Sequence, residues 1–167
     1  RPGSLAAGAT VTLEAEEEHH LAVRRALPGA EIQLLDGAGT RAHGRVVAAG
    51  NRVAVVVEEM TVDPAPVETV LAVAAGDRDR FGILVEQAGQ LGATRLVPLE
   101  TERTASVATR LREGHLDRVR RRAREVIKQS GAAWAPVVDS PQSVAGFLAR
   151  TKSGSRWLAD LEGSPAP

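Results

Sequence analysis

Two polar clusters in this chain carry side chains that could bind or transform a ligand. Residues 76–80 (GDRDR) follow an apolar run at residues 69–75, and residues 100–104 (ETERT) follow a second run at residues 95–99. An arginine in such a place can hold a phosphate or carboxylate through its planar guanidinium. An aspartate at the start of a helix can instead serve as its N-cap, with the arginines solvated. The sequence leaves both interpretations of residues 76–80 open.

Glu100 and Glu102 allow a second kind of chemistry. A hydrolase that acts on sugars needs two carboxylates that converge in a cleft, one of them with a raised pKa. Residues spaced by two share one side only if the segment is extended. A sugar-processing hydrolase is therefore an alternative, although nothing else in the chain favours it.

The adjacent pair His19-His20 raises the question of a metal site. Neighbouring side chains on a helix diverge by about 100°, and no third ligand stands nearby in the sequence. The chain also has no cysteine. We therefore expect no metal, and a surface role in packing or in phosphate contact together with Arg24 and Arg25.

The charge of the chain is balanced overall but uneven locally. The 21 basic and 21 acidic side chains give a net charge of zero, whereas residues 103–128 contain nine basic and three acidic ones. Such a cluster is typical of a phosphate-facing surface, and it can also be a solvated helix face. Both interpretations remain open. The following residues 128–131 (KQSG) have the character of a helix end, with Gly131 in the left-handed position.

The first part of the chain reads as a small β-barrel. A short helix at residues 16–25 interrupts the strands, residues 36–39 (DGAG) predict a hairpin turn, and residues 63–66 (DPAP) predict a linker. Several short strands at this spacing favour a barrel. The predicted strands span residues 11–13, 31–35, 42–48 and 53–57.

Strands and helices alternate after the linker, which is the pattern of an α/β domain. Ligands bind beyond the carboxyl ends of the strands in such sheets, so residues 76–80 and 100–104 are the expected site. Ser140 is a plausible N-cap for a helix that begins at Pro141. The predicted strands span residues 69–75, 95–99, 135–138 and 156–159, and the predicted helices span residues 79–91, 112–130 and 141–150.

No apolar run approaches the length of about 20 residues that a membrane span needs, and no signal segment opens the chain. A cytoplasmic protein without a membrane partner is expected. The chain begins with Arg1 rather than methionine and ends in a loop-like segment. We therefore expect it to be incomplete at both ends.

Four segments in this order and spacing resemble the RsmE-like family, which belongs to the SPOUT class of methyltransferases. They are residues 16–39 (EEEHHLAVRRALPGAEIQLLDGAG), 75–104 (AGDRDRFGILVEQAGQLGATRLVPLETERT), 120–131 (RRRAREVIKQSG) and 134–144 (WAPVVDSPQSV).

This resemblance implies an α+β protein of two domains. Residues 1–66 would form a PUA-like β-barrel that binds RNA, and residues 67–167 would begin an α/β domain of the SPOUT, trefoil-knot class. The family's Gly-Pro-Glu-Gly-Gly loop, which builds the knot and the methyl-donor pocket, would lie beyond Pro167. The implied activity is methylation of N3 of a uridine in 16S ribosomal RNA of the small subunit, with S-adenosylmethionine as cofactor and a homodimer as the assembly.

The resemblance also implies which side chains face RNA, without assigning a catalytic base. The chain departs from the family at three or more charged positions, with Ala75 for lysine, Gln90 for glutamate, Lys128 for glutamate and Ala132 for arginine. A non-catalytic RNA- or ribosome-binding protein on the same scaffold is therefore the alternative. The side chains expected to face RNA are His19, His20, Arg25, Arg78, Arg103 and Gln129.

Overall fold

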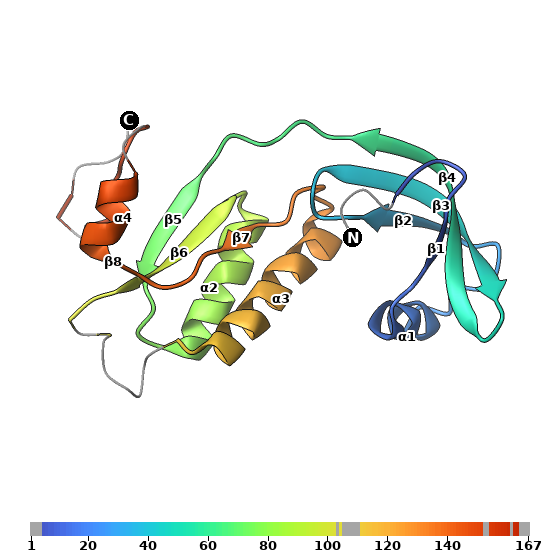
Figure 1. The fold of residues 1–167 in the computed structure, drawn as a ribbon, viewed down its shortest axis with the longest axis horizontal. Helices are drawn as coiled ribbons and strands as arrows, with labels where there is room; N and C mark the ends of the chain where they lie inside the picture. Colours follow the sequence, from blue (N-terminus) through green and yellow to red (C-terminus); the bar gives the residue numbers. More distant parts are fainter. Residues whose placement is uncertain (1–4, 103, 105–110, 152–153, 161, 164–167) are drawn as a thin grey trace.

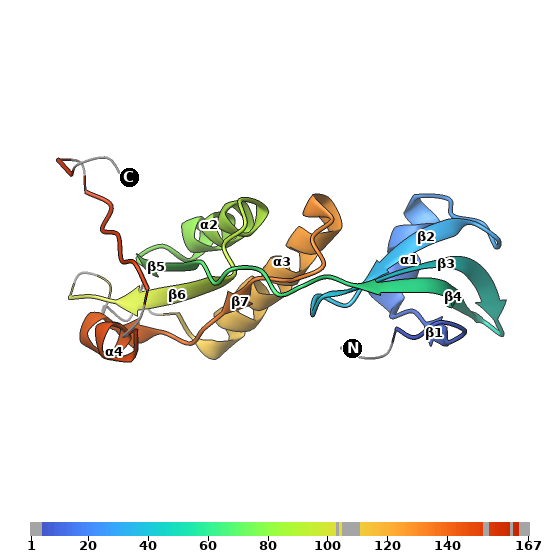
Figure 2. The same ribbon diagram turned by 90° about the horizontal axis from the view of Figure 1, so that it is seen from above.

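The computed structural model describes residues 5–102, 104, 111–151, 154–160 and 162–163, which form two sheets joined by an extended segment (Figure 1). Viewed from above, the two sheets lie one after the other along the long axis of the molecule (Figure 2). No helix within these ranges is long and apolar enough to cross a membrane.

The N-terminal sheet is antiparallel, with strand order β1-β4-β3-β2. Its core contains Leu5, Ala42 and Val57, with Val11 and Leu34 packed against them. The structure confirms the four predicted strands, although β1 and β2 do not pair with each other among the described residues, so a closed barrel remains a prediction. The elements are β1 (Thr10–Thr12), α1 (Ala15–Val23), β2 (Glu31–Leu35), β3 (Thr40–Ala49) and β4 (Arg52–Val62).

The second sheet is parallel, and its order is β5-β6-β7, with β8 also paired to β6. Helices α2 and α3 pack on it around a core that includes Leu96 and Leu116, whereas α4 lies beside β6 and β8, away from those two helices (Figure 1). The elements are β5 (Val70–Ala74), α2 (Arg78–Gln90), β6 (Arg95–Glu100), α3 (Glu113–Ser130), β7 (Val137–Val138), β8 (Gln142–Ser143) and α4 (Val144–Arg150).

Two glycines allow α2 and α3 to approach closely. A Cβ on Gly82 would lie 2.7 Å from a terminal nitrogen of Arg122, and one on Gly89 would lie 3.2 Å from a methyl carbon of Val126. A side chain at Gly89 would press on Pro136 and on Val126 of α3, whereas one at Gly82 would displace only the end of the flexible Arg122 side chain. Both glycines thus leave room for side chains of α3, and the fit is tighter at Gly89.

Three predictions for the last third of the chain are wrong in detail. Residues 156–159 form no strand, and α4 begins at Val144 rather than at Pro141. The N-cap is Ser143, whose side chain accepts a hydrogen bond from the amide of Gly146 at 3.0 Å. Ser140 cannot serve as the cap because the intervening residues of β8 pair with the end of β6.

The hairpin turn at residues 36–39 joins β2 to β3 as predicted, and it also contacts the segment that follows α3. The amide of Gly39 donates to the carbonyl of Ala133 at 2.9 Å, and the amide of Ala135 donates to the carbonyl of Gly37 at 2.9 Å. The indole Nε1 of Trp134 donates to the carbonyl of Asp63 at 3.2 Å. We call these contacts between residues 36–41, Asp63 and residues 131–135 the junction.

Arg41 reinforces the junction from the start of β3. Its guanidinium binds both carboxylate oxygens of Asp63, at 2.9 to 3.1 Å, and donates to the carbonyl of Gly131. The hydrogen bonds to Asp63 raise the pKa of Arg41. Because Gly131 ends α3 in the left-handed conformation, with φ of 68°, this contact fixes the carboxyl end of the helix against the N-terminal sheet.

Candidate functional site

The carboxyl ends of β5 and β6 meet at one edge of the parallel sheet. Ala74 pairs with Leu99 in the ladder, so the loops that follow the two strands lie together. A Cβ on Gly76 would lie 3.3 Å from the Cγ2 of Thr104. The structure thus brings together residues 76–80 and the loop that begins at Glu100, as the sequence predicts.

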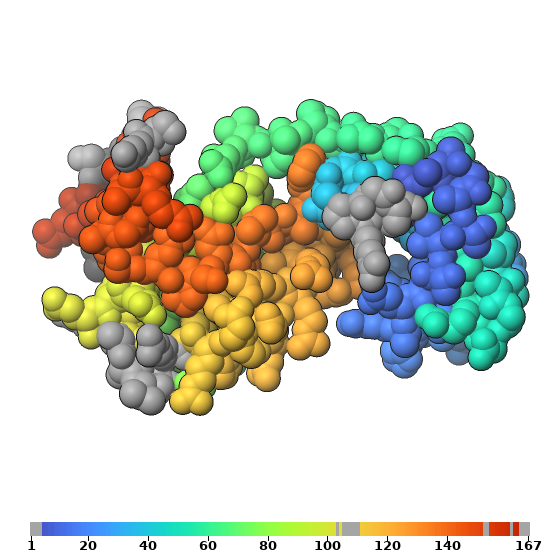
Figure 3. All heavy atoms as spheres, viewed as in Figure 1, coloured from blue at the N-terminus to red at the C-terminus, as the bar shows by residue number. Residues whose placement is uncertain are grey.

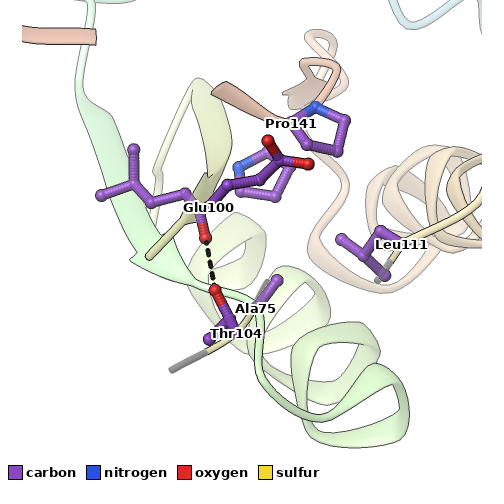
Figure 4. Close-up of a pocket in the computed structure, with 7 residues that line it drawn as sticks. Ala75, Glu100, Thr104, Leu111 and Pro141 are labelled. Carbon is purple, nitrogen blue, oxygen red and sulfur yellow. Dashed lines mark hydrogen bonds between the residues drawn. The ribbon is translucent and has the colours of Figure 1, made fainter. Parts of the chain in front are cut away.

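A small recess opens at this edge (Figure 4). It encloses about 230 Å³, open solvent included, and its walls are mostly apolar. Glu100 is the only carboxylate among the lining residues, which are Ala75, Pro98, Leu99, Glu100, Thr104, Leu111 and Pro141.

The loop after β6 is folded back on its strand by Thr104. The hydroxyl of Thr104 accepts a hydrogen bond from the amide of Thr101 at 2.8 Å and lies 3.5 Å from the carbonyl oxygen of Leu99 (Figure 4). Glu102 lines an open hollow outside the recess, together with Glu100. The recess itself therefore does not contain the pair of carboxylates that a sugar hydrolase would need. Arg103 lies outside the described residues.

The first helical turn after β5 is held by Asp77. Its side chain accepts hydrogen bonds from the amides of Arg80 at 2.9 Å and Asp79 at 3.0 Å, as an N-cap does. These bonds, that from Arg80 first, lower the pKa of Asp77. The capping interpretation is therefore correct for Asp77, and Arg78, which follows it, is left to make contacts of another kind.

Arg78 meets His115 where α2 and α3 begin. A terminal nitrogen of the Arg78 guanidinium lies 3.3 Å from Nε2 of His115. A guanidinium can only donate hydrogen bonds, so Nε2 must be the accepting nitrogen and Nδ1 must carry the proton. Nδ1 is buried and has no hydrogen-bond partner in the described part of the chain. The contact thus joins the amino ends of α2 and α3, and neither side chain is among the residues that line the recess.

Gln129 lies far from that pair, at the other end of α3. Its side-chain oxygen accepts a hydrogen bond from the amide nitrogen of Gln90 at 2.8 Å, and both side chains are exposed. The rise of an α-helix places Gln129 about 20 Å along the axis from His115. Arg78 and Gln129 therefore do not belong to one compact site.

The remaining predicted residues lie on or just after α1. His19, His20 and Arg25 are all exposed. Arg25 has a φ of 55°, the left-handed conformation in which a glycine usually follows a helix. No group of three or more histidine or acidic side chains among the described residues could hold a metal ion.

Sequence reasoning missed His115. A lone histidine near the start of a helix carries no motif, and its contact with Arg78 spans 37 positions in the chain. The only indication of this contact in the sequence was that each of two predicted helices begins after a loop that is expected to face a ligand. Their starts must then come close together if both helices cover the same face of the sheet.

Two family models match this chain. One, described as an RNA methyltransferase PUA domain, matches residues 13–59, and another, described as an RNA methyltransferase domain, matches residues 63–165. Together they cover the second sheet and most of the first, without β1, in the same order as the structure has them.

Known proteins resemble the chain over most of its length. Ribosomal RNA small subunit methyltransferase E from a Synechocystis species is 32% identical over 157 residues, which is 92% of this chain and 50% of that protein. The crystal structure of a Ribosomal RNA small subunit methyltransferase E from Neisseria gonorrhoeae, bound to S-adenosyl methionine, is 26% identical with a TM-score of 0.79 and matches 92% of this chain and 64% of that one.

A Legionella pneumophila protein solved with the cofactor SAM has the same fold, with a TM-score of 0.74 at 18% identity over 91% of this chain and 65% of that one. The chain thus spans about half the length of the curated relative and less than two thirds of the length of these two solved structures.

Proposed function

The chain belongs to the family of RNA methyltransferases that carry a PUA domain, and on this premise we propose that it provides the RNA-binding part of an S-adenosylmethionine-dependent enzyme. The proposed reaction is methylation of N3 of a uridine in 16S ribosomal RNA, within the small ribosomal subunit. The observation that carries the proposal is the likeness of both domains, in order and fold, to the S-adenosyl methionine-bound enzyme from Neisseria gonorrhoeae.

The proposal assigns RNA contacts, rather than methyl-donor contacts, to the described residues. The recess at the sheet edge leaves only about 10 Å³ for the centres of water-sized molecules, far less than the 300–1,000 Å³ that ligand pockets usually occupy. Its walls are also mostly apolar and do not fit a nucleoside with charged groups. S-adenosylmethionine would supply the methyl group, and we derive no contact of this chain with it.

Arg78 and His115 have the chemistry to bind the substrate nucleotide. Loss of the N3 proton leaves negative charge on the uracil ring, and donors fixed in place stabilise such a charge. The Arg78 guanidinium is a donor of this kind, and the contact with Nε2 of His115 at 3.3 Å orients it. We propose them as positioning groups for the uracil or its phosphate.

The other RNA contacts proposed from the sequence are those of His19, His20, Arg25 and Gln129, and of Arg103 outside the described residues. We also propose that residues 1–66 and 67–167 are the two domains, and that the enzyme is a homodimer.

A methylation assay tests the proposed function. The full-length protein is incubated with small ribosomal subunits that lack the modification and with labelled S-adenosylmethionine, and the digested RNA is analysed for N3-methyluridine by mass spectrometry. We expect one labelled N3-methyluridine per subunit. Binding to the subunit without any methylated uridine would contradict the proposal and support a non-catalytic RNA-binding protein.

One structural observation favours that second candidate. Ala75, at the position where the resemblance predicts lysine, is buried in the wall of the recess. The wall therefore lacks the cation that a lysine would bring to the reacting end of the sheet. If the wild type binds the subunit without methylating it, a gain of methylation in Ala75→Lys would support this second candidate, because it would show that the missing cation abolished the activity.

A further inference from the structure

Helix α1 of the N-terminal part reaches the carboxyl half of α3 through a side-chain contact. An ion pair joins them, since Nζ of Lys128 is 2.7 Å from Oε1 of Glu17. The same ammonium lies 2.9 Å from Oε2 of Glu125. In Figure 3 the atoms of α1 (blue) and α3 (orange) face each other across an indentation in the lower outline of the molecule.

The ion pair fixes which faces of the two helices look at each other. Side chains three, four or seven positions apart lie on one face of a helix. On α1, His20 and Arg24 therefore share the face of Glu17. On α3, Arg121 and Arg124 share the face of Lys128, about 10 Å and 6 Å from it along the axis. Two rows of side chains consequently line the indentation, with Arg24 as the cation of the α1 row and with Arg121 and Arg124 beside Lys128 on α3.

The arginines of these rows have no structural partner. Arg24, Arg121 and Arg124 are exposed, and none of them forms an ion pair or a side-chain hydrogen bond with another residue in the described part of the chain. The nearby acids are already engaged, because Glu17 and Glu125 both bind Lys128. The rows therefore keep an excess of positive charge that faces solvent.

Other arginines on the same elements differ in this respect. Arg120 of α3 binds Glu113 at 2.7 Å and donates to the carbonyl of Val138 at 3.2 Å. Arg52 of β4 binds Glu18 of α1 at 2.7 Å. The fold thus uses Arg120 and Arg52 for its own packing, whereas the arginines at the indentation have no such partner in the described part of the chain. Arg118 and Arg122 of α3 are likewise exposed without a partner there, so it is the position of Arg121 and Arg124 on the face of Lys128 that distinguishes them.

We propose that α1 and α3 together bind the phosphate backbone of RNA across the junction, with phosphates held by Arg24, Arg121 and Arg124. Guanidinium groups in a row suit phosphates, which accept two parallel hydrogen bonds. Base stacking is disfavoured, because neither helix has an aromatic side chain other than His, Phe81 being on α2. The identity of the anion as RNA rests on the proposed function, whereas the surface itself rests on the geometry of the two helices.

The salt dependence of RNA binding tests this surface. The full-length protein and its Arg121→Ala/Arg124→Ala variant are titrated onto a labelled RNA hairpin from the small subunit at several salt concentrations. We expect the affinity to fall about tenfold or more. The slope of log affinity against log salt should become shallower by about 0.7–0.9 for each lost phosphate contact. The melting temperature of the variant should equal that of the wild type, because neither arginine forms an ion pair or a side-chain hydrogen bond in the described part of the chain.

Arg150→Ala/Arg156→Ala is the matched control. It removes the same charge from exposed arginines that also lack an ion pair among the described residues. Its salt slope should equal that of the wild type. Equal losses in both double variants would overturn the proposal, since net charge alone would then explain binding. Arg24→Ala must also reduce the slope, and an unchanged slope would overturn the participation of α1.

The methylation assay separates this inference from the proposed function. If the wild type methylates RNA while Arg121→Ala/Arg124→Ala binds it with an unchanged salt slope, the proposed phosphate-binding surface is contradicted and the proposed function is supported. If the wild type fails to methylate RNA while the double variant loses RNA binding, the proposed function is contradicted and the phosphate-binding surface is supported.

Discussion

At its carboxyl end α3 is tied to the N-terminal sheet through backbone groups, whereas at its amino end it meets α2 through side chains. The junction engages the carbonyls of Gly131 and Ala133, so its geometry is set by the main chain. The amino end presents Arg78 and His115, which share one contact of 3.3 Å. Main-chain contacts fix the position of a helix, while guanidinium and imidazole side chains can also bind ligands. One end of α3 therefore has a structural role, and for the other end we propose a role in ligand binding.

Gly39→Val should give the largest effect on the structural end. Gly39 has a φ of 102°, and a Cβ there would lie 2.6 Å from Cζ2 of Trp134. The variant combines backbone strain with a steric clash, so we expect a loss of about 2–4 kcal/mol in the free energy of unfolding. Urea titration followed by circular dichroism measures it.

Gly50→Ala is the control for Gly39→Val. Gly50 has a φ of 64° with nothing within 4 Å of a Cβ, so it reports strain alone, at about 1 kcal/mol. If the two variants lost the same free energy, the contact with Trp134 would contribute nothing to the junction.

Arg78→Ala should give the largest effect on the chemical end. We expect the kcat/KM for methylation to fall by about 10- to 100-fold, the range that corresponds to a lost hydrogen bond from a charged group. Arg78→Lys should recover part of the lost kcat/KM, since lysine keeps the positive charge but not the two parallel hydrogen-bond donors of a guanidinium. A loss of activity that follows the loss of melting temperature would mean that Arg78 supports only the packing of α2 on α3.

The features that could be predicted from the sequence are those that depend on local geometry rather than on contacts between distant segments. The ends of α2 and α3 follow from Gly92 and Gly131, which both adopt positive φ and act through local geometry. The start of α4 was placed wrongly because Gln142 pairs with Leu99, which is distant in the chain. Local signals predict where elements end, while pairing between distant segments changes where they begin.

The candidate site shows the same division. The edge of the sheet was predictable because parallel strands bring their carboxyl ends together, and the structure places Gly76 beside Thr104. The Arg78–His115 contact was not predictable from the sequence, because it depends on how α2 and α3 pack against each other. The double role of residues 36–39, as a hairpin turn and as part of the junction, was hidden for the same reason.

A smaller effect is expected from separating Arg41 and Asp63 at the junction. The pair is partly exposed, which weakens its contribution. Arg41→Met should lower the unfolding midpoint by clearly less than Gly39→Val does. A double-mutant cycle with Asp63→Asn, measured in urea, should show that the two losses are not additive, because either change removes the same ion pair. Additive losses would show that Arg41 acts only through the carbonyl of Gly131.

The smallest effect concerns Asp77 at the chemical end, and it depends on pH. The hydrogen bonds from the amides of Arg80 and Asp79 hold the pKa of Asp77 below its ordinary value in the folded state. The ionised cap therefore stabilises the fold above the pKa of the unfolded chain, and this contribution is lost as the pH falls through the lower, folded pKa. Asp77→Asn keeps the capping oxygen but not the charge. The stability advantage of the wild type over Asp77→Asn should thus be present at neutral pH and shrink steadily in acid, as thermal unfolding across that pH range would measure. A difference that stayed constant with pH would mean that the cap acts through its hydrogen bonds alone and that its charge contributes nothing.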